Sequence, residues 1–320
     1  MKAIFNNEII NDKELLMDVD DRAFQYGDGV FETIIIRNNS SKLLKYHCNR
    51  LIEGARVLNF QLPAYFNIQF LESSIFMLIQ ENGIKSAARI KVQVWRKKGG
   101  YYKPESNTSN LLIIVNVHKD EAGTLKNVGI SKSVNNHYTT YSEFKTLNAL
   151  KYIIASIEKE ESHFDDMIIL DQIGNISELL YSNIFWIKKN IFYTPSLETG
   201  CIRGVMRSYL IERLKEKRIQ LMEVKVTPEQ VYMADYVIAT NASGIRSIIG
   251  IADVQYKVLR STAYRPYLAI GLAFLTRKFT LPTGQSPIGK SAPPLFELPN
   301  RINPSKTDCN MREMVVGLNS

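Results

Sequence analysis

The sequence predicts an α+β protein of two domains. Its 320 residues are 45% hydrophobic, which is enough to bury two cores. Short apolar or alternating runs typical of strands are interleaved with longer stretches that carry apolar residues at helical spacing. A polar segment that ends in Gly123 predicts the boundary, giving a small domain at 1–118, a linker at 119–123 and a larger domain at 124–256.

In the small domain, two hairpins are predicted from paired apolar runs, at 2–5 with 8–10 and at 33–37 with 42–44. Amphipathic helices are predicted where apolar residues recur at helical spacing, at 45–58 and 67–82. Alternating or apolar runs predict two more strands, at Ala88–Trp95 and Leu111–Val117.

The larger domain alternates strands and helices in the same way. Helical spacing predicts helices at about 147–160 and 204–217. Short apolar runs predict strands at 166–170, 183–187, 191–194, 221–226, 236–240 and 245–249.

Residues 257–320 differ in composition from the body. Seven of the eleven prolines lie after residue 254, and from Val254 onward there are nine Lys/Arg against three Asp/Glu. The first 253 residues hold thirty-one and twenty-nine, so most of the net charge of +8 lies in the tail and nucleic-acid binding is not expected. For this atypical basic, proline-rich tail we favour a frameshifted, non-native origin over a lineage-specific extension. We expect it to pack poorly and to supply no site residue.

Several classes of protein and site are not expected. No window reaches the roughly eighteen unbroken apolar residues of a membrane span, and the N-terminus lacks the apolar core of a signal peptide. Cys48, Cys201 and Cys309 are far apart and outside any metal-ligand spacing, and the four histidines are scattered. Reduced thiols, a cytoplasmic location and no metal site are therefore expected.

Two residues could serve one cofactor. Lys145, in the run Glu-Phe-Lys-Thr-Leu-Asn, supplies an amine, and Glu178, thirty-three residues later, supplies a carboxylate. Pyridoxal phosphate needs an amine that forms an imine and a carboxylate that keeps its ring nitrogen protonated. Arg50 could bind a phosphate through its guanidinium fork. Each of these alone is more often solvated surface or part of a salt bridge.

Two glycine-containing segments could bind an anion. The run Ile202–Arg207 opens a predicted helix, and the free N–H groups at a helix start attract phosphate. The run Thr240–Gly244 follows a predicted strand and offers small polar groups and accessible backbone N–H groups. Taken singly, the first is a weak signal, because many helices start near a glycine, and the second is more simply an ordinary turn.

Taken in order with the glycine-rich run Asp21–Thr33, these motifs resemble the fold type IV pyridoxal-phosphate enzymes, the class IV aminotransferase family. The resemblance covers about residues 3–256. It implies a small N-terminal α/β domain, a larger cofactor-binding domain with a β-barrel-like core, pyridoxal 5'-phosphate as cofactor and a small-molecule substrate. Family members are commonly homodimers, so a homodimer is expected.

The resemblance also implies a role for each site residue. Lys145 forms the Schiff base with the cofactor, Glu178 pairs with the pyridine nitrogen and Arg50 binds the phosphate. The phosphate site is completed by backbone N–H groups at Val205 and Met206, with Asn241 or Ala242.

Local features favour one branch of this family. D-amino-acid aminotransferases resemble one another in a tyrosine where this chain has Phe31, and in an Arg-x-His clamp that the loop after residue 95 lacks. Branched-chain aminotransferases usually have threonine where Met206 stands and a Gly-Thr-Ala turn where Thr240–Ala242 stands. The pattern looks more like 4-amino-4-deoxychorismate lyase, which releases pyruvate and leaves 4-aminobenzoate for folate synthesis.

Other interpretations stay open. The chain could be a class IV aminotransferase that acts on branched-chain or other amino acids. It could also be a catalytically silent family member, or a protein that keeps the cofactor for structure, but intact Lys145 and Glu178 argue against both.

Overall fold

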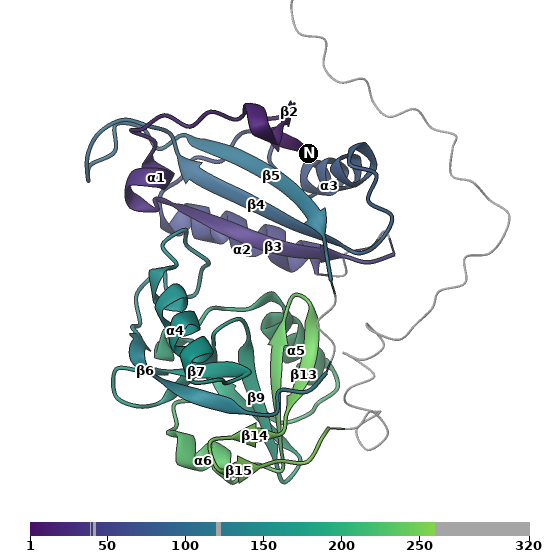
Figure 1. Ribbon diagram of the computed structural model, residues 1–320, viewed down its shortest axis with the longest axis vertical. Helices are drawn as coiled ribbons and strands as arrows, with labels where there is room; N and C mark the ends of the chain where they lie inside the picture. The colour runs from purple at the N-terminus through teal and green to yellow at the C-terminus, as the bar shows by residue number, and fades with distance from the viewer. Residues whose placement is uncertain (39, 41–42, 120–122, 260–320) are drawn as a thin grey trace, which may run out of the picture. The chain divides into compact units, whose positions relative to one another are not determined.

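The computed structural model describes residues 1–38, 40, 43–119 and 123–259, all within one compact unit that spans Met1–Arg277. In the described residues, helices accompany three five-stranded sheets (Figure 1). This mixed architecture confirms the predicted α+β class. The predicted tail, residues 257–320, lies outside the described part, apart from residues 257–259.

The first sheet is antiparallel and has the strand order β2-β1-β5-β4-β3. Its strands are β1 (Lys2–Phe5), β2 (Glu8–Asn11), β3 (Gly29–Ile36), β4 (Ala88–Arg96) and β5 (Ser109–Val117). A short helix precedes β3, and two longer helices cover one face of the sheet (Figure 1): α1 (Arg22–Tyr26), α2 (Leu44–Val57) and α3 (Ile68–Glu81).

Strand β3 has two different faces because successive side chains alternate across a strand. Ile34 and Ile36 are buried in the core beneath α2 and α3. Phe31 and Thr33 lie on the opposite face and are only partly buried. The half-buried face is therefore available to contact the rest of the chain.

The other two sheets have the strand orders β11-β10-β9-β12-β13 and β15-β14-β6-β7-β8. The strands of the former are β9 (Asn183–Lys188), β10 (Ile191–Pro195), β11 (Leu221–Val224), β12 (Tyr236–Asn241) and β13 (Gly244–Ile248). Those of the latter are β6 (Val128–Asn136), β7 (Asp166–Asp171), β8 (Ile176–Leu179), β14 (Gly250–Ile251) and β15 (Val254–Gln255). The accompanying helices are α4 (Leu150–Glu161), α5 (Val205–Glu216) and α6 (Pro228–Tyr232).

These two sheets share one core. Ile184 and Val237 on one sheet pack with Ile168 and Ile176 on the other. Helix α5 packs on the far face of β9 and β12, against residues such as Phe185. Two sheets that meet face to face give this part of the chain the barrel-like core that the resemblance implied.

One predicted hairpin is wrong. Leu44 begins α2 instead of ending a strand, Leu43 immediately precedes it, and only an isolated bridge joins Arg37 to Ser40. All eight residues of β3 pair with β4 instead, with Thr33 opposite Lys91. A nine-residue partner pairs with β3 along its whole length, which a three-residue local strand could not do.

The sequence left four strands unpredicted: β6, β8 and the two-residue strands β14 and β15. Strand β6 carries Ser131, Lys132, Ser133 and Asn135, so its apolar alternation is weak. Strand β8 has only four residues, although all of them are buried. The predicted linker at 119–123 includes residues outside the described part, so the division into two domains stays a prediction.

Three further observations concern the thiols, metal sites and membrane spans that the sequence analysis considered. Cys48 and Cys201 are buried free thiols. In the part of the chain that the structure describes, no three His, Cys, Asp or Glu side chains are grouped to hold a metal ion. Within the same residues, no helix has the length and apolar character needed to cross a membrane.

Candidate active site

Ile202 and Arg203 precede Gly204, the N-cap residue of helix α5. They contact two of the predicted site residues, Glu178 and Arg50, and the loop that carries the third, Lys145. The Ile202 N–H donates to Glu178 Oε2 at 3.0 Å. The Arg203 carbonyl accepts from Arg50 Nη1 at 2.9 Å. The Arg203 N–H donates to the backbone carbonyl two residues before Lys145, at 2.9 Å. The start of α5 therefore gathers residues that are far apart in the sequence.

Lys145 lies against strand β3 of the first sheet. Its carbonyl accepts the Phe31 N–H at 2.8 Å, and its Nζ lies 5.0 Å from the centroid of the Phe31 ring. Burial, and then the charge of Arg50, lower the pKa of Lys145 to about 8, although Glu32 and Glu178 act in the opposite direction. The neutral, nucleophilic amine is therefore far more populated near pH 7 than for an ordinary lysine.

Arg50 is held by a buried carboxylate. Glu32 accepts from Arg50 Nε at 2.7 Å and from Nη2 at 2.6 Å, and it also contacts His47 Nδ1 at 2.6 Å. Burial raises the pKa of Glu32, but Arg50 and His47 more than offset this and bring it to about 2. Burial lowers the pKa of His47. An arginine has five N–H donors, so Arg50 keeps donors on Nη1 and Nη2 for an anion.

Glu178 is buried on strand β8 and has several hydrogen-bond donors. Its Oε1 accepts from Asn136 Nδ2 at 3.0 Å and from Tyr152 Oη at 2.7 Å, while Oε2 accepts from Ile202. Burial, and then Glu178, raise the pKa of Tyr152 well above its ordinary value, so this phenol stays a donor. Lys151 donates to Asn136 Oδ1 at 2.6 Å and so orients the amide. These donors fix the position of the Glu178 carboxyl group.

The start of α5 and the end of β12 form one wall. Helix α5 has no side-chain cap at Gly204. A Cβ at that glycine would lie 1.9 Å from Asn183 Oδ1, so no other residue fits without displacing Asn183. Thr240 lies opposite Asn183 in the strand pairing and is 1% exposed, and its Oγ1 has no hydrogen-bond partner among the described residues. Buried hydroxyls are usually satisfied, so this wall suits an anionic ligand with acceptor oxygens.

The predicted residues Asn241 and Ala242 lie directly after Thr240. Asn241 Nδ2 donates to Ser182 Oγ at 3.1 Å, and its Oδ1 accepts the Ser243 N–H at 2.9 Å. The Asn241 side chain therefore stabilises the turn, and only the backbone of Asn241 is left to contact a ligand. Ala242 packs at the edge of the core beneath α5.

Several of these residues were not singled out from the sequence. Glu32 stands inside the glycine-rich motif, and His47 is three residues before Arg50 on one helix, so spacing gave a partial signal for these two. Asn136 and Tyr152 gave none, because their contact with Glu178 joins segments that are distant in the chain.

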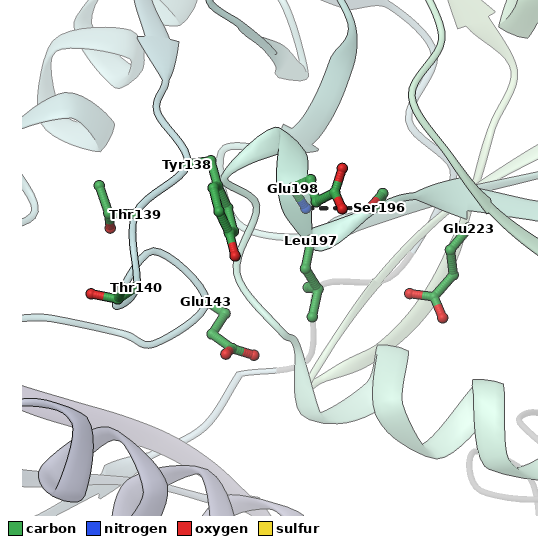
Figure 2. Close-up of a pocket in the computed structure, with 8 residues that line it drawn as sticks. All are labelled: Tyr138, Thr139, Thr140, Glu143, Ser196, Leu197, Glu198 and Glu223. Carbon is green, nitrogen blue, oxygen red and sulfur yellow. Dashed lines mark hydrogen bonds between the residues drawn. The ribbon is translucent and has the colours of Figure 1, made fainter.

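A pocket of about 430 Å³ lies nearby but is not this site. As Figure 2 shows, it is lined by Tyr138, Thr139, Thr140, Glu143, Ser196, Leu197, Glu198 and Glu223. Each of its three carboxylates is paired with a basic side chain: Glu143 with Arg203, Glu198 with Lys225 and Glu223 with Arg207. Since none of the predicted site residues lines it and its charges are neutralised, it has no evident chemistry of its own.

Comparisons with known proteins agree with this geometry. The family model described as amino-transferase class IV matches residues 29–251. The chain is 28% identical to an aminodeoxychorismate lyase of Bacillus subtilis, covering 74% of this chain and 82% of the relative. It is 26% identical to a D-alanine aminotransferase of Bacillus licheniformis, covering 83% and 93%. A branched-chain aminotransferase structure from Thermoproteus uzoniensis has the same fold, with a TM-score of 0.74 and 22% identity over 84% of this chain and 97% of that one.

Proposed function

Because the chain belongs to the amino-transferase class IV family of pyridoxal-phosphate-dependent enzymes, we propose that it binds pyridoxal 5'-phosphate around the start of helix α5. Lys145 holds the cofactor covalently and Glu178 pairs with its ring nitrogen. Arg50 binds its phosphate together with the N–H groups of Val205 and Met206. The backbone at Asn241 or Ala242 and the Thr240 hydroxyl complete the phosphate site.

The observation that carries this proposal is the gathering of Lys145, Glu178 and Arg50 around one uncapped helix start. The donor set fits the group: Arg50 keeps free N–H donors, and Thr240 offers a buried hydroxyl that lacks a partner among the described residues. A buried carboxylate with three donors suits a protonated ring nitrogen, which needs an anion beside it.

The residues of the chain then have separate tasks. When bound, pyridoxal phosphate supplies an electron sink for the bond that breaks at the substrate. Glu178, held in place by three hydrogen bonds, keeps the proton on the ring nitrogen. The Lys145 amine, whose burial lowers its pKa to about 8, can accept and return a proton near neutral pH.

We further propose that the reaction is that of a lyase, which converts 4-amino-4-deoxychorismate to 4-aminobenzoate and pyruvate in cytoplasmic folate synthesis. Phe31, the lack of an Arg-x-His clamp and Met206 support this choice, as does the similarity to the Bacillus subtilis lyase. A class IV aminotransferase is the second candidate, because the D-alanine aminotransferase and a putative branched-chain aminotransferase of Methanocaldococcus jannaschii are nearly as similar, at 26% and 24% identity.

Incubation with aminodeoxychorismate should form 4-aminobenzoate and pyruvate in equal amounts, measured by chromatography and a coupled pyruvate assay. D-alanine with 2-oxoglutarate should give negligible glutamate, because Phe31 lacks the hydroxyl and the loop lacks the clamp. The Lys145→Ala variant serves as the blank. Rapid glutamate formation from branched L-amino acids, with no 4-aminobenzoate, would instead assign the chain to the aminotransferases.

We also propose that two copies associate through helix α4. Leu150, Ile153 and Ile157 follow one stripe of this helix and are 60%, 56% and 54% exposed, whereas Ala155 is its only fully buried residue. An apolar stripe of this kind on a surface helix is typical of an interface. A two-fold axis would bring the stripe against its own copy, so each chain would cover the other.

The wild-type protein should therefore have a mass of twice the 36.6 kDa chain in sedimentation equilibrium. Ile153→Glu should shift it toward the monomer, because a charge would be buried in an apolar interface. Ile173→Glu is a matched control, since Ile173 is 81% exposed and lies in the turn between β7 and β8. A monomeric wild type, or a dimer that Ile153→Glu leaves intact, would disprove the α4 pairing.

A further inference from the structure

One face of strand β3 extends from the amine of Lys145 to the turn after β12. At one end, the Phe31 ring centroid lies 5.0 Å from Lys145 Nζ. At the other end, Arg37 Nη2 donates to the carbonyl of Ser243 at 3.0 Å. Thr33 lies between them on the same face as Phe31. This half-buried face of the first sheet is therefore one wall of the candidate site.

Lys91 lies on this wall. It is directly opposite Thr33 in the pairing of β3 with β4, and its Nζ lies 5.3 Å from the centroid of the same Phe31 ring. Gln93, two residues further along β4, is opposite Phe31 and shares this face. Two amines, those of Lys91 and Lys145, thus contact one aromatic ring.

Among the residues that the structure describes, no opposite charge neutralises the Lys91 side chain. Within the described ranges, no carboxylate lies at ion-pair distance from its Nζ, and its neighbour on the same face is another cation, Arg89. Burial, and then Arg89, lower the pKa of Lys91, which is the response of an ammonium group that lacks an anion. A half-buried cation of this kind is stabilised when an anionic ligand binds beside it.

We propose that Lys91 is the binding residue for a carboxylate of the substrate, with the Gln93 amide as a second donor. The inference rests on the proposed function, which places the reacting amine of the substrate at Lys145. The Phe31 ring, which both amines contact, then packs against the body of the substrate. The site takes molecules that carry an amine at one end and a carboxylate within reach of β4, as the substrates of both candidate reactions do.

The test uses benzoate and benzamide as probes, because they have the same shape and differ in charge. Binding of each to the cofactor-loaded protein is measured by calorimetry, without turnover. Wild type should prefer benzoate, Lys91→Met should bind benzoate about tenfold or more weakly with no change for benzamide, and Lys91→Arg should restore the preference. Lys85→Met is the control, because Lys85 is exposed and precedes β4.

Two results would overturn the inference: a wild type that does not distinguish the two probes, or a Lys91→Met variant that binds benzoate like wild type. The cofactor absorbance and thermal melt of each variant show whether the site is intact. A wild type that takes up no cofactor would instead overturn the proposed function, so the two failures are distinguishable.

Discussion

Lys145→Ala should abolish the visible absorbance of the lysine-bound cofactor and all turnover, while the protein remains folded. The Lys145 amine has no ion-pair partner in the described part of the chain and its Nζ lies 5.0 Å from the centroid of the Phe31 ring, so its removal breaks no buried ion pair. The expected loss is therefore chemical and not structural. Absorbance spectra of the purified variant and its thermal melt measure the two effects separately.

Lys151→Met provides a matched control for this loss. Burial also lowers the pKa of Lys151, but its Nζ donates to Asn136 and not toward Phe31, so the absorbance band should persist. A band that survives in Lys145→Ala would show that the lysine is wrongly assigned.

The attachment of cofactor to the apo-protein should also depend on pH in a specific way. The attacking form of Lys145 is the neutral amine, so the rate should rise with pH up to about 8 and level off above it. An ordinary lysine would make the rate rise toward pH 10.5. Stopped-flow absorbance between pH 6 and 10, in roughly half-unit steps, distinguishes the two profiles.

Arg50→Met should weaken cofactor binding and also destabilise the fold. Loss of a charge-assisted phosphate contact is worth about 1.5–3 kcal/mol of binding free energy. The same change leaves Glu32 buried without its cation, which should lower the free energy of unfolding by about 3–5 kcal/mol. Cofactor titration and chemical denaturation of the apo-protein measure these two quantities.

The double variant Glu32→Met/Arg50→Met separates the two effects. Removing both charges should recover part of the lost stability, because no unpaired carboxylate remains, but it should not recover cofactor affinity. Glu178→Gln makes the converse comparison: it should lower turnover strongly, while its affinity for the cofactor stays closer to that of the wild type. Wild-type cofactor affinity in the double variant would exclude Arg50 as a phosphate ligand. Normal turnover of cofactor-saturated Glu178→Gln would exclude the predicted pairing of Glu178 with the ring nitrogen.

The two charged residues that are predicted to contact the cofactor illustrate what can be predicted from sequence. Lys145 and Glu178 were singled out because each has a chemistry that the cofactor requires and because several motifs occur in one order. The structure brings both to the residues ahead of α5, through the Ile202 N–H and the loop before Lys145. Their roles stay predictions until the variants are measured.

By itself, the sequence determined the α+β class, the helices such as α2 and α5, and the motif order that indicates the family, because periodicity and motif spacing are local properties of the chain. Only the tertiary structure decided that β3 pairs with β4, that Glu32 joins Arg50 to His47, and that Lys91 and Lys145 contact the same Phe31 ring. These contacts join residues that are distant in the chain. Their free energy comes from burial and from neutralising buried charge, which depend on what surrounds a residue in the folded protein and not on its neighbours in sequence.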